Sequence, residues 1–219
     1  MTASVADPLV PPASAVADVL ALWGHDGWLT PPLHPVVVAS APAIGRALTL
    51  TISTGTAGSG LAPIYDVLSG DLAGRVLLLA GASAVPGAVW GEILTLAALQ
   101  QGATAVLVDG WVRDKTEMTR LGLPVYANGE QVVGPNGRAH LLQIDATVMV
   151  HGVAVTADDL IVVDRTGCVR VPSARADAVL EASRRYVAAE ELVAKALAAG
   201  EPLARAYRHK KSIVDELRR

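Results

Sequence analysis

The chain has 219 residues, a formal net charge of −3 and 52% hydrophobic residues. This length is sufficient for one well-buried domain, and the charge balance lacks the strong positive bias of a nucleic-acid-binding protein. The single cysteine, Cys168, excludes an internal disulfide and favours a reducing compartment. No targeting segment is evident at the N-terminus, and no apolar run reaches the roughly 18 residues of a membrane span. We therefore expect a cytoplasmic protein with neither a membrane nor a nucleic acid as its partner.

The N-terminus predicts an arm followed by a short helix. Residues 1–13 are rich in proline and are predicted to be a flexible arm, and Ser14 is predicted to cap a helix that runs through Leu22. Internal repeats and low-complexity segments are not evident. Residues 14–219 are therefore expected to form a single α/β domain with a mixed, strand-rich core and helices on its flanks.

The first half of the chain then predicts short strands separated by loops. Its glycine-rich segment 54–60 is not a phosphate-binding loop, because no Lys-Ser or Lys-Thr follows it and the G-x-G-x-x-G register is absent. We expect a flexible loop beside a binding pocket instead. Strands are predicted at Val36–Val38, Gly45–Ser53 and Arg75–Leu79, and a helix is predicted at Leu61–Leu68.

The middle of the chain predicts a helix between two strands. Gly91–Gln101 has the composition of a helix buried on most of its faces, and Ala105–Val108 is a short apolar run typical of a buried strand. In a right-handed β-α-β unit, the helix begins at the sheet edge where the following strand ends. The lengths of the helix and the strand agree, because about 11 helical residues span roughly 16 Å and about six strand residues span roughly 20 Å in the opposite direction. We therefore expect Gly91 to meet Arg113 and Asp114.

That meeting point combines groups suited to an anion and a metal ion. The first turn of the helix offers free N–H donors, and the Arg113 guanidinium is a planar fork that grips a carboxylate or phosphate. The Asp114 carboxylate repels such a ligand unless it holds a divalent cation that the ligand also touches, and hard oxygen ligands favour Mg²⁺ or Mn²⁺. The alternative is that Arg113 and Asp114 form an ordinary surface ion pair.

The second half of the chain predicts mainly strands. The last two of them form a hairpin in which Gly167 is expected to need a positive φ, His151 is expected in a turn, and Cys168 is expected in the core. A turn-rich connection is predicted at Gly129–Gly137. Strands are predicted at Pro124–Tyr126, Leu141–Ile144, Thr147–Val150, Leu160–Val163 and Cys168–Val171.

The C-terminal part of the chain predicts one long helix. Apolar residues recur at three and four residues from Ala174 to Gly200, and the polar face carries Glu181, Glu190 and Glu191. The basic cluster at 205–211 on a final helix is expected to be a solvated tail or a subunit contact, not an RNA site.

Four segments together resemble one known family. Its sharpest pattern is an acidic residue, then twenty residues, Arg-Asp, two residues and a second acidic residue, which Glu92, Arg113-Asp114 and Glu117 match. The chain resembles, over about residues 16–200, the RraA-like family, which includes the regulator of ribonuclease E activity A and the class II 4-hydroxy-4-methyl-2-oxoglutarate aldolases. The similar segments are 90–94, 108–114, 121–126 and 159–164.

The resemblance implies a fold, an assembly and a chemistry. The fold is the swivelling β/β/α sandwich with a long C-terminal helix, and the assembly is a homotrimer, or a hexamer, with sites at subunit interfaces. The chemistry is retro-aldol cleavage of 4-hydroxy-2-oxo acids, or decarboxylation of oxaloacetate, with Mg²⁺ or Mn²⁺ held by Asp114. Arg113 is implied as catalytic, as is Glu190 of a neighbouring subunit, with Glu191 as the second choice. Substrate binding is implied for Arg113 and the backbone N–H groups of Gly91, Glu92, Ile93 and Leu94.

The chain also departs from the family's pattern. Ala80 stands where an aspartate is usual, Pro86 interrupts the loop that follows, and His151 replaces the first glycine of a usual Gly-Gly-Val turn. These departures leave the substrate open. Two alternatives to a pyruvate-type lyase therefore remain: a non-catalytic binding or regulatory protein, and an enzyme of secondary metabolism that uses the same enolate-stabilising site.

Overall fold

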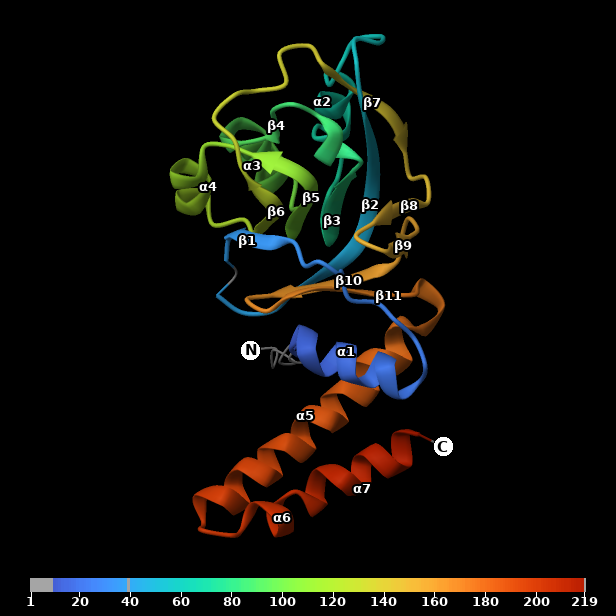
Figure 1. Cartoon of the computed structure of the whole chain (residues 1–219), viewed down its shortest axis with the longest axis vertical. Coiled ribbons are helices and arrows are strands. Elements are labelled where there is room, and N and C mark those ends of the chain that lie inside the picture. The colour runs from blue at the N-terminus through green and yellow to red at the C-terminus, as the bar shows by residue number, and fades with distance from the viewer. Residues whose placement is uncertain (1–9, 39, 219) are drawn as a thin grey trace, which may run out of the picture.

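The computed structural model describes residues 10–38 and 40–218 and has two parts. Figure 1 shows an α/β body at the top and a helical extension below it, with the C-terminus returning toward the N-terminal helix. No helix of the described residues is long and apolar enough to span a bilayer.

One large sheet organises the body. In the described part of the chain, nine strands belong to it, along the path β1-β6-β5-β3-β2-β10-β11, with β4 paired to β5 and β7 paired to β2. The centre, β6-β5-β3-β2, is parallel, and the pairs that β1, β7, β10 and β11 make are antiparallel. The strands are β1 (His34–Val37), β2 (Ala43–Thr54), β3 (Arg75–Ala80), β4 (Ala88–Trp90), β5 (Ala105–Val112), β6 (Val125–Glu130), β7 (Ala139–Ile144), β10 (Leu160–Asp164) and β11 (Gly167–Val171).

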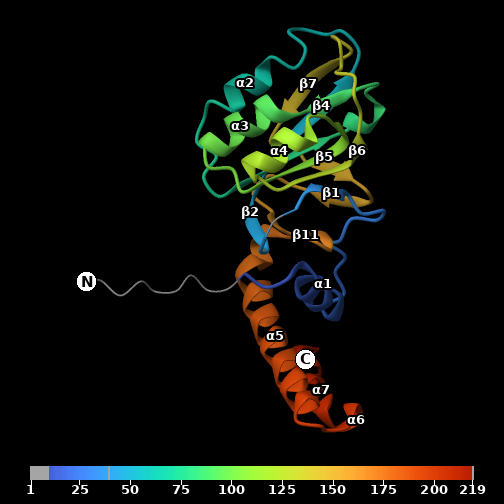
Figure 2. The same cartoon turned by 90° about the vertical axis from the view of Figure 1, so that its left-hand side faces the viewer.

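The parallel centre is covered on both faces, as its continuous apolar strands require. On β5, Val106 and Val108 enter one core while Ala105 and Leu107 enter another, because successive side chains of a strand point to opposite faces. Helices α2 (Pro63–Val67), α3 (Glu92–Gln100) and α4 (Lys115–Leu121) cover the first face, as Figure 2 shows. The hairpin of β8 (Val148–Val150) and β9 (Val153–Val155) covers the second.

The helical extension is attached through a third core. Helices α1 (Ala13–Leu22) and α5 (Ala176–Ala198) pack against β10 and β11, and the short helix α6 (Leu203–Ala206) leads into α7 (Arg208–Leu217), which runs back along α5 (Figure 1). The Trp23 indole N–H donates to the carbonyl of Leu217 at 2.8 Å. This bond ties the end of α7 to the end of α1.

The expected α/β architecture with a long C-terminal helix is confirmed, as are most of the predicted strands. The predicted cap of the first helix is wrong. The helix begins at Ala13, and its N-cap residue, Pro12, offers no side-chain hydrogen bond. The Ala13 N–H donates instead to the Asp164 carboxylate at 2.8 Å. A distant carboxylate thus replaces the local Ser14 cap. Of the predicted arm at 1–13, residues 1–9 lie outside the described residues, and Ala13 is already helical.

Other differences lie around the end of β5. The strand continues to Val112, four residues beyond its predicted end, because β4 and the end of β6 pair with Trp111 and Val112. Consequently Gly129 and Glu130 belong to β6 and not to a turn. Strand β4, helix α4 and strand β9 had no sequence prediction.

Candidate active site

Two strand-to-helix junctions lie side by side at one edge of the sheet. β4 passes through Gly91 into α3, and β5 passes through Arg113 and Asp114 into α4. The Arg113 backbone N–H donates to the Trp90 carbonyl at 3.0 Å, and the Glu92 N–H donates to the Asp114 carboxylate at 3.4 Å. The predicted meeting of the helix start with the Arg-Asp pair is therefore confirmed.

Gly91 makes this close approach possible. Its backbone is extended, so the reason for glycine is space and not a positive φ. A Cβ atom at Gly91 would lie 2.7 Å from Asp114 Oδ2 and 3.1 Å from Arg113 Cγ. Any other residue would separate the two junctions or displace both side chains.

Asp114 has an uncommon backbone conformation. Its φ of 59° and ψ of 39° are in the left-handed region, immediately before α4. Aspartate tolerates this region better than most residues, and such conformations cluster at functional sites. The bend lets the carboxylate turn back toward Glu92 instead of capping its own helix. The side chain stays 39% exposed.

Arg113 is held beside Asp114 without being saturated by it. The guanidinium Nε lies 3.5 Å from Asp114 Oδ2, and the side chain is 51% exposed. The connection after β6 passes next to it, since a Cβ atom on Gly134 would lie 3.4 Å from Arg113 Nη1. The remaining guanidinium donors are therefore accessible to a ligand.

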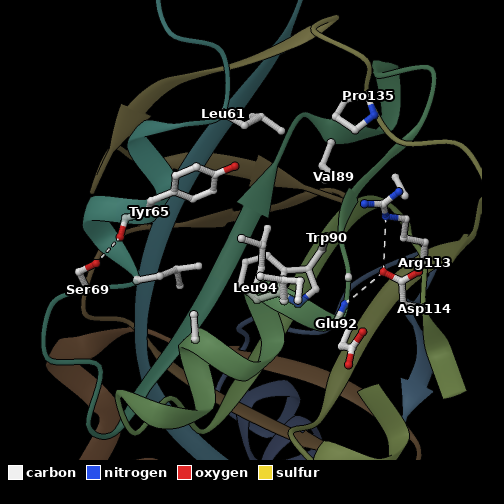
Figure 3. Close-up of a pocket in the computed structure, with 15 residues that line it drawn as sticks. Leu61, Tyr65, Ser69, Val89, Trp90, Glu92, Leu94, Arg113, Asp114 and Pro135 are labelled. Atoms are coloured by element: carbon white, nitrogen blue, oxygen red, sulfur yellow. Dashed lines mark hydrogen bonds and ion pairs between the residues drawn. The ribbon is translucent and has the colours of Figure 1, made fainter. Parts of the chain in front are cut away.

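These groups form one end of a pocket with a volume of about 620 Å³. All six residues predicted around the helix start line it: Gly91, Glu92, Ile93, Leu94, Arg113 and Asp114. Figure 3 shows Arg113, Asp114 and Glu92 together on one side of the pocket, with Tyr65 and Ser69 on the opposite side. The pocket thus has a polar end and, away from it, a mainly apolar wall.

The donor set at the polar end fits a hard divalent cation. No group of three or more His, Cys, Asp or Glu side chains in the described residues is placed to hold a metal ion. Mg²⁺ does not require such a cage, because it usually keeps several waters and takes one or two carboxylates plus oxygen atoms of the substrate. Asp114 provides a partly exposed carboxylate that faces a space with room for waters and a ligand.

Glu190 lies outside this pocket. It is in the C-terminal half of α5, the part that Figure 1 shows extending away from the body. Its carboxylate accepts a hydrogen bond from Lys210 on α7 at 2.7 Å, and Lys210 also stacks over the Tyr186 ring. Burial lowers the pKa of Lys210, but the hydrogen bonds to Glu190 and Tyr186 outweigh it and raise that pKa overall. The role of Glu190 in a neighbouring subunit stays a prediction.

A polar cluster on the other face of the sheet had no prediction. The Asp109 carboxylate accepts from the Asn128 amide at 3.2 Å and from the Gly81 N–H at 3.1 Å, and it lies 3.3 Å from His151 Nε2. His151 is in the predicted turn, with φ 45°. None of these side chains lines the pocket. The cluster joins β5, β6 and the residue after β3 to the β8–β9 hairpin.

The sequence also did not identify the far wall of the pocket. Its members come from α2 and from the residues directly before and after it, and they are brought to α3 only by tertiary packing. Ala80, which replaces the family's usual aspartate, is buried in the core on the other face of the sheet and does not line the pocket. The far-wall residues are Leu61, Tyr65, Leu68 and Ser69, and the lining is completed by Ala88, Val89 and Pro135, of which Val89 and Pro135 lie toward Arg113 (Figure 3).

Comparison with known proteins places the pocket within a matched region. A family model described as RraA-like, aldolase/RraA, matches residues 13–170. A protein of Albidiferax ferrireducens named as a 4-hydroxy-4-methyl-2-oxoglutarate aldolase is 31% identical over 105 residues, which are 48% of this chain and 60% of that protein. The protein DlpA of Legionella pneumophila is 27% identical over 118 residues, 54% of this chain and 19% of DlpA. The chain therefore spans less than two thirds of the length of either of these relatives.

A solved structure has the same fold. It is an RraA protein of Streptomyces coelicolor, described as an unusual member of the ribonuclease ES inhibitor RraA family. The two structures superpose with a TM-score of 0.72 at 21% identity, over 82% of this chain and 89% of the other. At this identity, the similarity establishes the fold alone.

Proposed function

Because the chain belongs to the RraA-like family, which includes class II aldolases as well as RraA regulators, we propose that it is a divalent-metal-dependent lyase acting on pyruvate-type 2-oxo acids. One observation carries this proposal. The start of α3, the Arg113 guanidinium and the Asp114 carboxylate converge at the polar end of one pocket. A surface ion pair does not require such a pocket.

The polar end suits the head of a 2-oxo acid. The N–H groups in the first turn of a helix have no helical partners and carry positive partial charge, so the start of α3 is suited to the substrate carboxylate. Arg113 adds two parallel donors for the carboxylate and the 2-oxo oxygen. Glu92 and Asp114 place negative charge nearby, and Mg²⁺ or Mn²⁺ bound at Asp114 offsets it.

The residues of the chain then stabilise one intermediate. When the C3–C4 bond of a 4-hydroxy-2-oxo acid breaks, its electron pair stays on C3, and the product is the enolate of pyruvate. Decarboxylation of oxaloacetate leaves the same enolate. Arg113 is placed to donate to the enolate oxygen, where preorganised donors have their largest effect. A bound Mg²⁺ or Mn²⁺ supplies Lewis-acid polarisation of the 2-oxo group.

The base and the assembly are further parts of the proposal. The 4-hydroxyl must lose its proton as the bond breaks. Among the described residues that line the pocket, the only carboxylates are those of Glu92 and Asp114, and no histidine or lysine is present. We assign the proton to an ordered water or to Glu190 of a neighbouring subunit. The Glu190 assignment requires an oligomer, and we propose a homotrimer, or a hexamer, in which the helical extension of one subunit reaches the pocket of the next.

The test is pyruvate release from a panel of 4-hydroxy-2-oxo acids and oxaloacetate, with and without metal. We expect release with Mg²⁺ or Mn²⁺, complete loss in EDTA, and recovery when either ion is restored, because one carboxylate and Arg113 alone do not polarise the carbonyl sufficiently. Full activity after verified metal removal would contradict the mechanism. Absence of release from every substrate would instead favour a non-catalytic RraA-type binding protein.

A further inference from the structure

The pocket continues well beyond its polar end, and its far wall is mainly apolar. Leu94 and Ala97 are three residues apart on α3, so they lie on one side of the helix. Leu61 and Leu68 face the same space from the other side, with Leu68 only 4% exposed. Figure 3 shows Leu61 and Leu94 between Tyr65 and the Arg113–Asp114 end. A ligand held at Arg113 can therefore extend along carbon-rich surface.

The charges of the pocket-lining residues favour an uncharged substrate tail over a negatively charged one. Arg113 is the only cationic side chain among the described residues that line the pocket, whereas Glu92 and Asp114 are both acidic. At the far wall, the Ser69 hydroxyl already donates to the Tyr65 carbonyl at 2.7 Å. A second carboxylate on the substrate would lose hydration there without gaining a cation, which is unfavourable. An uncharged tail loses nothing comparable.

The size of the pocket is consistent with a substrate that carries an apolar tail. Its volume of about 620 Å³ is typical of sites for small molecules that are much larger than pyruvate. We infer that the substrate is a 4-hydroxy-2-oxo acid with an uncharged apolar group on C4, not a dicarboxylate. This inference rests on the proposed lyase function and specifies the substrate class of the same site.

The reaction balances without any further reactant. The bond between C3 and C4 breaks, its electron pair forms the pyruvate enolate, and the 4-hydroxyl proton passes to the base as C4 becomes an aldehyde. A proton then returns to C3. The products are pyruvate and an apolar aldehyde, and neither oxidation nor reduction takes place.

A homologous series tests the inference. The substrates are 4-hydroxy-2-oxo acids whose C4 group is lengthened from methyl to hexyl, together with an analogue of similar length that ends in a carboxylate. Each added methylene should raise kcat/KM about two- to fourfold until the far wall is reached, the upper figure being about 0.8 kcal/mol of apolar burial at 1.36 kcal/mol per decade. The dicarboxylate should be the poorer substrate by at least tenfold.

A substitution at the far wall sharpens the test. Tyr65 is 61% exposed, so Tyr65→Arg adds a cation to this wall at little risk to folding. It should lower the ratio of kcat/KM for the hexyl substrate to that for the dicarboxylate at least tenfold. Leu99→Arg is the matched control, because Leu99 is 37% exposed on α3 and does not line the pocket. It should leave the ratio unchanged.

The outcomes separate this inference from the proposed function. Pyruvate release that is independent of tail length, or fastest with the dicarboxylate, would overturn the tail inference and leave the lyase intact. If Tyr65→Arg alters the oligomeric state in light scattering and not the substrate ratio, the wall is a subunit contact and the inference is wrong. If no substrate is cleaved, the inference is tested by binding: calorimetry compares the affinities of 2-oxobutanoate, 2-oxooctanoate and 2-oxoadipate. Tighter binding of 2-oxooctanoate supports the apolar wall, and equal binding overturns it.

Discussion

Two arginine–aspartate ion pairs of this molecule consist of the same side chains but differ in their surroundings. Arg170 Nε lies 2.7 Å from Asp159, whose side chain is 3% exposed and also accepts the N–H groups of Thr156 and Ser173 at 2.9 Å each. Arg113 Nε lies 3.5 Å from Asp114, and both side chains are more than a third exposed. The first pair is saturated by its own chain. The second pair retains hydrogen-bond donors and acceptors that can bind a ligand.

The difference shows how a structural ion pair is distinguished from a site. A buried carboxylate is tolerated only when its oxygens are satisfied, and Asp159 meets this requirement by joining the start of β10 to β11 and to the segment after it. Asp114 is positioned by a left-handed backbone and receives one long hydrogen bond. The same two residue types thus stabilise the fold in the first pair and form an accessible ligand site in the second.

The largest effect on activity is expected at the open pair, from Arg113→Lys. Lysine retains the charge but lacks the planar fork, so a site that grips a carboxylate and an enolate oxygen should lose about 2–4 kcal/mol of transition-state stabilisation. This corresponds to a fall in kcat/KM for pyruvate release of about 30- to 1000-fold. The melting temperature should hardly change, because the Arg113 side chain is half-exposed.

The control for this variant is Lys115→Met. Lys115 is the next cation along the chain, is half-exposed, and pairs with Glu130 at 3.1 Å outside the pocket. Such exposed pairs contribute little, so neither activity nor melting should shift appreciably. Wild-type pyruvate release by Arg113→Lys would show that the open pair is an ordinary surface ion pair.

The saturated pair predicts the opposite result. Asp159→Asn replaces an acceptor by an amide donor in front of three N–H groups, and the Arg170 charge loses its partner, so the free energy of unfolding should fall by about 3 kcal/mol. For a chain of this size, that lowers the melting temperature by about 6–12 °C. Activity per folded molecule should stay unchanged. A specific loss of activity with normal melting would place Asp159 in the site after all.

The sequence allowed the polar end of the pocket to be predicted because local and topological rules act together there. Periodicity located α3 and β5, and the handedness of the β-α-β unit placed Gly91 beside Asp114. The far wall depended on how α2 packs on the sheet. Tyr65 and Leu68 carry no signal that separates a pocket wall from a helix face.

Contacts between residues far apart in the sequence explain the other differences between prediction and structure. The end of β5 reads as a loop because Asp109 and Gly110 interrupt the apolar run, yet pairing with β4 and β6 extends the strand through them. The Asp109 carboxylate is accommodated because Asn128 on β6 and Gly81, directly after β3, both donate hydrogen bonds to it. Likewise, the cap of α1 is supplied by Asp164, 151 residues away from Ala13.

The smallest expected signal is a partial recovery of activity, and it tests Glu190, whose carboxylate is bound by Lys210 of its own chain. Glu190→Gln preserves this hydrogen bond but removes the base, and Asp114→Asn removes the metal ligand of the pocket. If each site combines Asp114 of one subunit with Glu190 of the next, both homo-oligomers should be nearly inactive.

Mixed oligomers of these two variants should recover activity. In an equal mixture with head-to-tail contacts, roughly a quarter of the sites join an intact Asp114 to an intact Glu190, so roughly a quarter of the wild-type rate should return. Native mass spectrometry confirms that the chains have mixed. No recovery in confirmed mixed oligomers would mean that each site lies within one subunit. Glu190 would then not be the base, because within one subunit it is on the helical extension and does not line the pocket. Glu191→Gln is the matched control, and if it loses activity where Glu190→Gln does not, the base belongs one residue further along the same helix.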